Sequence, residues 1–206
     1  MSEYAKFTED MIKTHTILVP NMLPIHFRLI IKIFESAGYK MELLQNESRS
    51  VIDEGLKNVH NDACYPALLV IGQFMDALKS GKYDLNKTAL IMSQTGGGCR
   101  ASNYIHLIRK CMNKNYPQIP VLSLNFSGLE KDSAFKITVP MFLKMLYAVI
   151  YGDLLMICYN KCRAYELVKG SALKKLNKWQ KILGNIFAKR SSEYLRTKSL
   201  YSQILE

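Results

Sequence analysis

The sequence lacks any uninterrupted run of the roughly 18 apolar residues that a membrane-spanning helix requires. Its most apolar stretch, residues 141–158, is broken by Lys144, Gly152 and Asp153. The first residues also lack the basic and apolar regions of a secretory signal peptide. Five cysteines, an odd number, do not indicate a disulfide framework in a chain of 206 residues. We therefore expect a cytoplasmic protein with no membrane partner.

Motifs typical of DNA- or RNA-binding domains are also absent, although the formal net charge is +11. Most of the basic excess lies between residues 168 and 198, where Glu193 is the one acid. The basic residues in this segment are Lys169, Lys174, Lys175, Lys178, Lys181, Lys189, Arg190, Arg196 and Lys198. A solvated helical face explains this charge most simply, and a surface for a partner or an anionic ligand is the main alternative. We expect no nucleic-acid partner.

Short apolar runs alternate with helical patterns in the first part of the chain. Strands are expected at residues 16–19, 41–44, 88–92 and 121–126. Helices are expected at residues 25–37, 50–58, 66–79 and 102–112, with Gly38 ending the first and Ser50 capping the second. The cluster at residues 68–71 also fits a strand. The alternation predicts an α/β fold with a doubly wound, mainly parallel sheet and helices on both faces, as in flavodoxin- or Rossmann-like domains.

The remainder of the chain has a different pattern. Residues 139–165 and 171–188 have helical periodicity without internal turn clusters. We therefore divide the chain into an α/β domain at residues 1–135, which holds the unusual cysteine motifs, and a basic C-terminal helical section at residues 136–206.

The first motif that could carry chemistry is the segment NDACYP at residues 61–66. Cys64 precedes a Tyr-Pro step, and proline is favoured in the first turn of a helix. A helix N-terminus stabilises negative charge and so favours the thiolate, which binds iron or attacks electrophiles. A buried, inert cysteine at a helix start is the alternative interpretation.

The second motif is the segment SQTGGGCRASNY at residues 93–104, between an expected strand and an expected helix. Open α/β sheets bind ligands at this position. Consecutive glycines allow close approach of the backbone, whose N–H groups can hold a phosphate or a sulfide-rich cluster. The spacing matches neither a Walker A loop nor a dinucleotide fingerprint. Candidate cofactor-binding residues are Gly96, Gly97, Gly98, Arg100 and Asn103, and Cys99 is a candidate metal ligand; a tight turn with an incidental cysteine is the alternative.

Cys64 and Cys99 would converge on one site if both loops open onto the same edge of the sheet. Two thiolates do not complete a cubane cluster, which usually takes about four ligands. Cys158 and Cys162 are four residues apart and share a helix face, where core packing is favoured over metal binding. His26 could line the site or be a structural histidine. No residue is assigned a catalytic role, and a thiol-transfer enzyme with Cys99 as nucleophile lacks an identifiable base.

These motifs resemble the dehydratase-like region of CoA-substrate-specific enzyme activases, relatives of 2-hydroxyglutaryl-CoA dehydratase and benzoyl-CoA reductase. The resemblance covers roughly residues 15–180, and its most specific element is the run GGGCR. The similar segments lie at residues 20–22, 24–28, 61–66, 81–84, 88–104 and 151–155.

The resemblance implies an oxygen-sensitive [4Fe-4S] cluster with Cys64 and Cys99 among its ligands. It implies an ATP-dependent activator or a second dehydratase-like subunit as partner, and low-potential electron transfer to an acyl-CoA whose ketyl radical then loses hydroxide. The chain would be a component of such a lyase or reductase system. The alternative is a non-catalytic module that holds a CoA or nucleotide phosphate at residues 96–98 and docks a partner through its basic helices.

Overall fold

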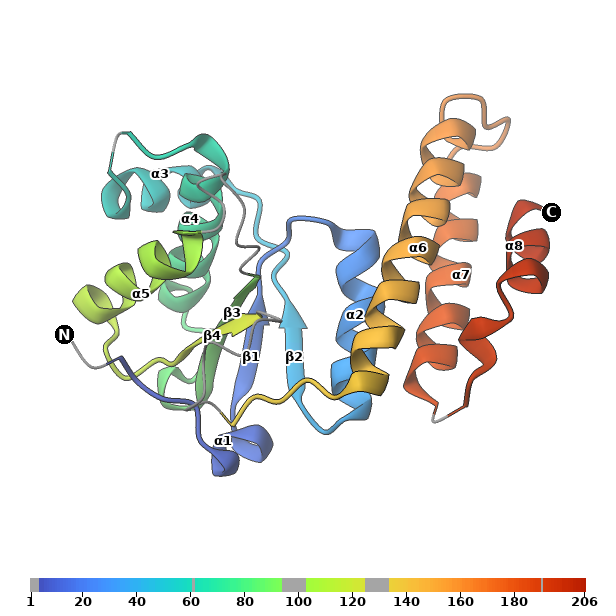
Figure 1. The fold of residues 1–206 in the computed structure, drawn as a ribbon. Coiled ribbons are helices and arrows are strands. Elements are labelled where there is room, and N and C mark those ends of the chain that lie inside the picture. The colour runs from blue at the N-terminus through green and yellow to red at the C-terminus, as the bar shows by residue number, and fades with distance from the viewer. Residues whose placement is uncertain (1–3, 61, 94–102, 125–133, 190) are drawn as a thin grey trace. The chain divides into compact units, whose positions relative to one another are not determined.

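The computed structural model describes residues 4–60, 62–93, 103–124, 134–189 and 191–206 (Figure 1). Its sheet has four parallel strands in the order β2-β1-β3-β4. The strands are β1 (Thr16–Val19), β2 (Lys40–Leu43), β3 (Thr88–Ser93) and β4 (Val121–Leu124). From β1 the chain goes first to β2 on one side and then to β3 on the other. The carboxyl ends of β1 and β3 therefore flank a topological switch point, where α/β folds bind ligands.

The fold class predicted from the sequence is confirmed: a parallel sheet alternates with helices and a helical section follows. The larger helices are α2 (Pro24–Ser36), α3 (Arg49–Asn58), α4 (Tyr65–Lys79), α5 (Tyr104–Asn115), α6 (Val139–Cys162), α7 (Ser171–Ala188) and α8 (Thr197–Leu205). Shorter elements are α1 (Glu9–Thr14) and the 3-10 turns η1 (Leu85–Lys87) and η3 (Glu193–Leu195). The sequence interpretation missed α1, α8 and both turns, which are too short for a clear periodic pattern.

Several predicted boundaries are corrected. Ser48, not Ser50, is the N-cap residue of α3, and the Ser50 hydroxyl instead donates a hydrogen bond to Asp76. Residues 68–71 are helical, as the main prediction for residues 66–79 had it, and not a strand; Val70 and Ile71 are buried, whereas Leu68 and Leu69 are partly exposed. Helix α6 ends at Cys162 and not at residue 165. Gly38, at φ 96°, follows the end of α2 as predicted.

The chain divides into two compact units, which are described separately. Unit 1 comprises Met1–Met22 and Tyr39–Lys136, and unit 2 comprises Leu23–Gly38 and Ile137–Glu206. The sequence analysis assigned residues 23–38 to the first domain, so the two divisions differ over α2. That helix packs against α6 and α7, which lie more than a hundred residues later in the chain.

The core of unit 1 lies between the sheet and the helices α4 and α5. Its fully buried side chains include Leu18 and Leu90 from the strands, Phe74 from α4, and Ile105 and Ile108 from α5. Burial of such side chains stabilises the folded state by about 1.5–3 kcal/mol each. This packing fixes the starts of α4 and α5, and both starts carry residues of the candidate site.

Helices α3 and α4 of unit 1 approach very closely. A Cβ atom at Gly72 would lie 2.0 Å from the Val51 carbonyl oxygen, and one at Gly55 would lie 2.5 Å from the Leu68 carbonyl oxygen. No other amino acid fits at either position without movement of the backbone. The two glycines therefore set the distance between these helices.

Unit 2 is built from α2, α6, α7, η3 and α8. Tyr151 of α6 is fully buried, and its hydroxyl donates a hydrogen bond of 3.0 Å to the Tyr194 carbonyl. His26 of α2 is also buried, with Nε2 2.9 Å from Asp153 Oδ1. A Cβ atom at Gly152 would lie 2.4 Å from the His26 ring, so this glycine makes room for the imidazole. His26 is therefore packed between helices of unit 2 and does not line the cavity described below.

Helix α6 is apolar on both sides. Its packed side includes Met145, Ala148 and Leu155. Its other side carries exposed apolar residues at helical spacing, which are Val139, Leu143, Leu146, Ile150 and Ile157. In the described part of the chain, α6 is the one helix that is long and apolar enough to cross a membrane. Core helices of soluble proteins also meet this criterion of length and composition.

Candidate functional site

The candidate site lies at the carboxyl edge of the sheet in unit 1. Asn21 follows β1 by two residues and Asn46 follows β2 by three. Helices α4 and α5 both begin at this edge, which places Cys64 and Tyr104 close together. Because carboxyl ends of parallel strands meet at one edge, segments far apart in the sequence come together here.

Cys64 is the N-cap residue of α4 and is partly exposed. Its backbone is extended, and Pro66 lies in the first turn of the helix, as the sequence predicted. Its Sγ atom lies 2.9 Å from the hydroxyl oxygen of Tyr104, the first residue of α5. Cys64 makes no side-chain capping hydrogen bond to α4, but the partial positive charge of a helix start favours a thiolate at this position.

A cavity of about 660 Å³ opens at the start of α4; Cys64 itself does not line it, but Tyr65, the next residue, does. Tyr104 lines it, as do Tyr65 and Pro66 at the start of α4. Its wall is mostly apolar, and polar atoms come from the loops after β1 and β2 and from α4. The remaining lining residues are Asn21, Met22, Asn46, Glu47, Ser48, Arg49, Val51, Ile52, Leu69, Val70 and Gln73. Volume and lining are those of a small-molecule site.

Gln73, a buried residue of α4, holds the two asparagine loops together. Its Oε1 accepts a hydrogen bond of 2.7 Å from the Asn21 backbone N–H, and its Nε2 donates one of 3.0 Å to the Asn46 carbonyl. Asn46 Nδ2 donates in return to the Gln73 carbonyl at 2.9 Å and to Asp76 Oδ2 at 2.8 Å. Through one side chain, α4 fixes the loop after β1, which borders the switch point, and the loop after the neighbouring strand β2.

Two buried amide oxygens of this region, Asn21 Oδ1 and Asn46 Oδ1, have no hydrogen-bond partner among the described residues. Buried acceptors without a donor cost free energy unless a ligand, water or another segment satisfies them. Both asparagines line the cavity. The cavity therefore suits a ligand that combines an apolar body with a hydrogen-bond donor.

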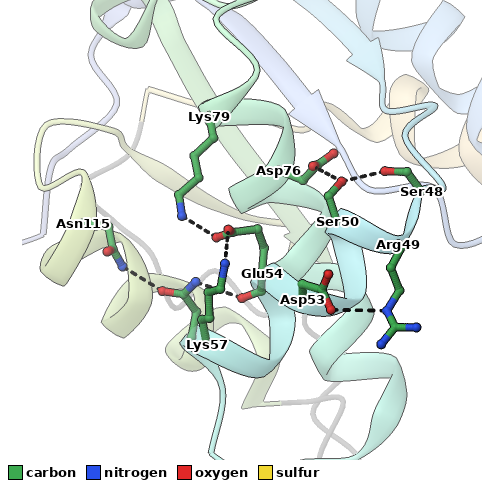
Figure 2. A network of polar contacts seen from close by, with 10 residues as sticks. Ser48, Arg49, Ser50, Asp53, Glu54, Lys57, Asp76, Lys79 and Asn115 are labelled. Atoms are coloured by element: carbon green, nitrogen blue, oxygen red, sulfur yellow. Dashed lines mark hydrogen bonds and ion pairs between the residues drawn. The ribbon is translucent and has the colours of Figure 1, made fainter.

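A polar network ties α3 to α4 beside the cavity (Figure 2). Glu54 is buried and accepts hydrogen bonds from Lys79 and, at 3.1 Å, from Lys57. The Lys79 ammonium, assisted by Lys57, holds the pKa of Glu54 below its usual range despite its burial. On the other side of α3, Ser48 contacts Ser50, which donates to Asp76. The network holds the helix that carries Arg49, Val51 and Ile52 of the cavity wall.

Most of the predicted glycine-loop site lies outside the described residues. These positions are Gly96, Gly97, Gly98, Cys99 and Arg100. Of the predicted cofactor-binding residues, Asn103 is described: it is exposed, precedes α5 directly and has no side-chain capping bond. The loop joins the end of β3 to the start of α5, and Tyr104 at that start contacts the Cys64 sulfur.

Of the other described cysteines, one lies within α5 of unit 1 and two lie in unit 2. Cys111 is buried in α5, and burial raises the pKa of its thiol. Cys158 and Cys162 both belong to α6 of unit 2. Burial, and then the neighbouring Cys162, raise the pKa of Cys158. A raised pKa disfavours the thiolate, so neither Cys111 nor Cys158 is typical of an activated thiol.

An iron–sulfur cluster takes about four cysteine ligands. In the described part of the chain no group of three or more His, Cys, Asp or Glu side chains could hold a metal ion. Cys64 is suitable in kind, because it is a partly exposed thiol at a helix start. At this edge the described residues thus include one of the two predicted cysteine ligands, Cys64, and the second, Cys99, lies outside them.

Comparisons with protein-family models, with curated proteins and with solved structures found no match to this chain.

Asn21, Asn46, Gln73 and Tyr104 were not singled out as ligand-binding residues from the sequence. A signal for the two asparagines exists, since each lies two residues beyond a predicted strand, where ligand-binding loops of α/β folds begin. Gln73 has no such signal. Its role depends on the packing of α4 against two loops that lie 27 and 52 residues away.

Proposed function

We propose that this chain is an iron–sulfur-cluster-binding component of a 2-hydroxyacyl-CoA dehydratase/activase-type system, with Cys64 and Cys99 among the cluster ligands. One observation carries the proposal. Tyr104 contacts the Cys64 sulfur and also lines the cavity of about 660 Å³. A thiol suited to metal binding therefore adjoins a cavity suited to an organic substrate.

The chemistry of Cys64 supports its role as a ligand. At the start of α4 its thiolate is stabilised by the helix dipole. The Tyr104 hydroxyl, 2.9 Å away, donates a hydrogen bond to the sulfur once the thiol is deprotonated. Hydrogen bonds to cluster sulfurs and limited solvent exposure are the features by which proteins set the potential of such clusters.

The cavity supports an acyl thioester as the substrate class. Its apolar wall, with Val51, Pro66 and Leu69, suits the carbon chain of an acyl group. Asn21 and Asn46, which also line the cavity, offer amide oxygens as acceptors for a substrate hydroxyl. When bound, a low-potential cluster supplies one electron to an acceptor; the residues of this chain hold the substrate beside it and limit access of water.

The described residues provide one cysteine ligand at the edge, so the cluster requires ligands from residues 94–102, from a partner or from substrate. We accordingly propose that an ATP-dependent activator or a second dehydratase-like subunit completes the system. The basic side chains of unit 2 are the candidate surface for such a partner.

Iron and acid-labile sulfide content after strictly anaerobic purification tests this proposal. We expect stoichiometric iron and sulfide in the wild type and at least a severalfold loss in Cys64→Ala and in Cys99→Ala. Cys162→Ala is the matched control, because this exposed cysteine lies in unit 2 and should leave the metal content unchanged.

Wild-type protein that stays free of iron after anaerobic reconstitution would rule out the cluster. The same fold would then be a binding module for an anionic or acyl ligand. Retention of the metal in Cys64→Ala would remove the assignment of this residue as a ligand.

A further inference from the structure

The loop that joins α6 to α7 carries large apolar side chains that are mostly exposed. We call residues 163–170 the hairpin tip; they lie at one end of the helix pair in unit 2 (Figure 1). Tyr165 is 86% exposed, Leu167 is fully exposed and Val168 is 68% exposed. Single exposed apolar residues are common on soluble proteins, but three within four positions of one loop are unusual.

The conformation of the hairpin tip is fixed by its one acid. Glu166 accepts hydrogen bonds from the backbone N–H groups of Gly170, at 2.6 Å, and Ala172, at 3.0 Å, and its Oε2 lies 3.4 Å from the Ser171 hydroxyl. Gly170, at φ 85°, adopts the left-handed conformation that starts α7. The Glu166 carboxylate is thus engaged in capping α7.

Positive charge surrounds the hairpin tip. Lys161, Arg163, Lys169 and Lys174 are all exposed, and none forms an ion pair within the described residues. Glu166 is the one acid between residues 154 and 192. The tip therefore combines an apolar centre with a basic rim and no competing free carboxylate.

We propose that the hairpin tip is a docking surface for an anionic lipid membrane. Apolar and tyrosine side chains enter the boundary between headgroups and acyl chains, and lysine and arginine side chains bind acidic headgroups. The protein would lie on the membrane surface through this loop, while its helices remain outside the bilayer. This surface contains no residue of the cavity and does not depend on the cluster.

The geometry favours a lipid surface over a protein groove or a second copy of the chain. A helix face such as that of Leu143, Leu146 and Ile150 offers a regular row of side chains that suits a partner helix. The hairpin tip is instead a short loop in which Tyr165 and Leu167 are almost entirely solvated. Lipid headgroups adapt to such a loop without a complementary concave surface.

Co-sedimentation of the full chain with large unilamellar vesicles tests the proposal. We expect binding to vesicles that contain phosphatidylserine in phosphatidylcholine, much weaker binding to phosphatidylcholine alone, and weaker binding as salt is raised. The double variant Leu167→Ser with Val168→Ser should bind at least about tenfold more weakly. Both side chains are exposed, so circular dichroism and thermal unfolding should match the wild type.

The matched control is Leu146→Ser with Ile150→Ser, which changes two exposed apolar residues of α6 away from the hairpin tip. This variant should bind anionic vesicles as the wild type does. The proposal is overturned if the wild type does not bind anionic vesicles, if the hairpin-tip variant binds as tightly as the wild type, or if the α6 variant is the one that loses binding.

Discussion

Gln73 is buried in a helix, yet its side-chain amide serves two loops that follow different strands. It accepts from the Asn21 N–H and donates to the Asn46 carbonyl, and both asparagines line the cavity. A buried glutamine is tolerated because both ends of its amide are paired. The shape of the candidate site therefore depends on a residue that belongs to the core.

Gln73→Ala should lower the free energy of unfolding by about 2–4 kcal/mol, because it leaves one buried donor and one buried acceptor unpaired. Urea denaturation measures this loss. Gln45→Ala is the control: Gln45 is exposed and makes one long contact of 3.5 Å, so a change within about 0.5 kcal/mol is expected. Equal effects of the two variants would contradict the role assigned to Gln73.

Glu54 gives the fold a pH dependence of known sign. Its pKa is lowered in the folded state, chiefly by the hydrogen bond from Lys79. A carboxyl whose folded pKa lies below its unfolded value stabilises the protein above the unfolded pKa, and this contribution is lost as the pH falls through the folded value.

We therefore expect Glu54→Gln to lower the free energy of unfolding by about 1–3 kcal/mol at neutral pH. The difference from wild type should shrink as the pH falls below the unfolded pKa of about 4.3, and it should be smallest below the lower folded pKa, where the wild-type carboxyl is protonated in both states. Asp53→Asn, on the exposed side of the same helix, should change stability by less than about 0.5 kcal/mol. If the difference in free energy of unfolding between wild type and Glu54→Gln grew as the pH fell, the lowered pKa assigned to Glu54 would be contradicted.

Helices α3 and α4 form the most closely packed pair in unit 1, and the packing has a steric cause. Gly72 meets the Val51 carbonyl and Gly55 meets the Leu68 carbonyl. Val51 and the neighbouring Ile52 line the cavity, so the distance between these helices also sets its width.

Gly72→Ala should destabilise the protein by about 1–3 kcal/mol, because the new methyl group would overlap a backbone oxygen that cannot move alone. The favourable helix propensity of alanine offsets part of this cost. Gly184→Ala in α7 is the matched control: its nearest neighbour is Cγ of the flexible Lys32 side chain at 3.2 Å. Thermal unfolding should show a lower midpoint for the first variant and little change for the second.

The elements of unit 1 could be predicted from local patterns, because strands of four to six residues and helices of ten to fifteen residues have distinct periodicities. The strand at residues 16–19 was predicted with its observed bounds. Helix ends were less predictable: α3 begins after Ser48 because Ser50 is bonded to Asp76, which lies 26 residues later. Contacts of this kind leave no local signal.

For the molecule as a whole, the parallel direction of the strands could be predicted, whereas the grouping of the helices into two units could not. Residues 23–38 follow β1 directly and still pack with α6 and α7. The packing of α2 against α6 depends on matched residues in the two helices. Gly152 leaves space for the His26 ring, and the neighbouring Asp153 forms a hydrogen bond with the imidazole. Such a match between distant segments is visible only in three dimensions.

The candidate site could be predicted in part. Cys64 was identified because proline, a helix start and a thiol together indicate a stabilised thiolate. Its contact with Tyr104 and the adjoining cavity could not be predicted, because they depend on how two helices start side by side. Cys99 and the glycine run remain predictions, since they lie outside the described residues.

The central claim joins a cluster at Cys64 to a substrate in the adjoining cavity, and one spectrum tests both. Electron paramagnetic resonance of the anaerobically purified, dithionite-reduced protein should show a [4Fe-4S] signal that changes when a 2-hydroxyacyl-CoA is added. In Leu69→Trp, where a larger ring fills the cavity, the cluster signal should persist and no longer respond to the thioester. A wild-type protein without a cluster signal, or with one that the thioester leaves unchanged, would contradict the account.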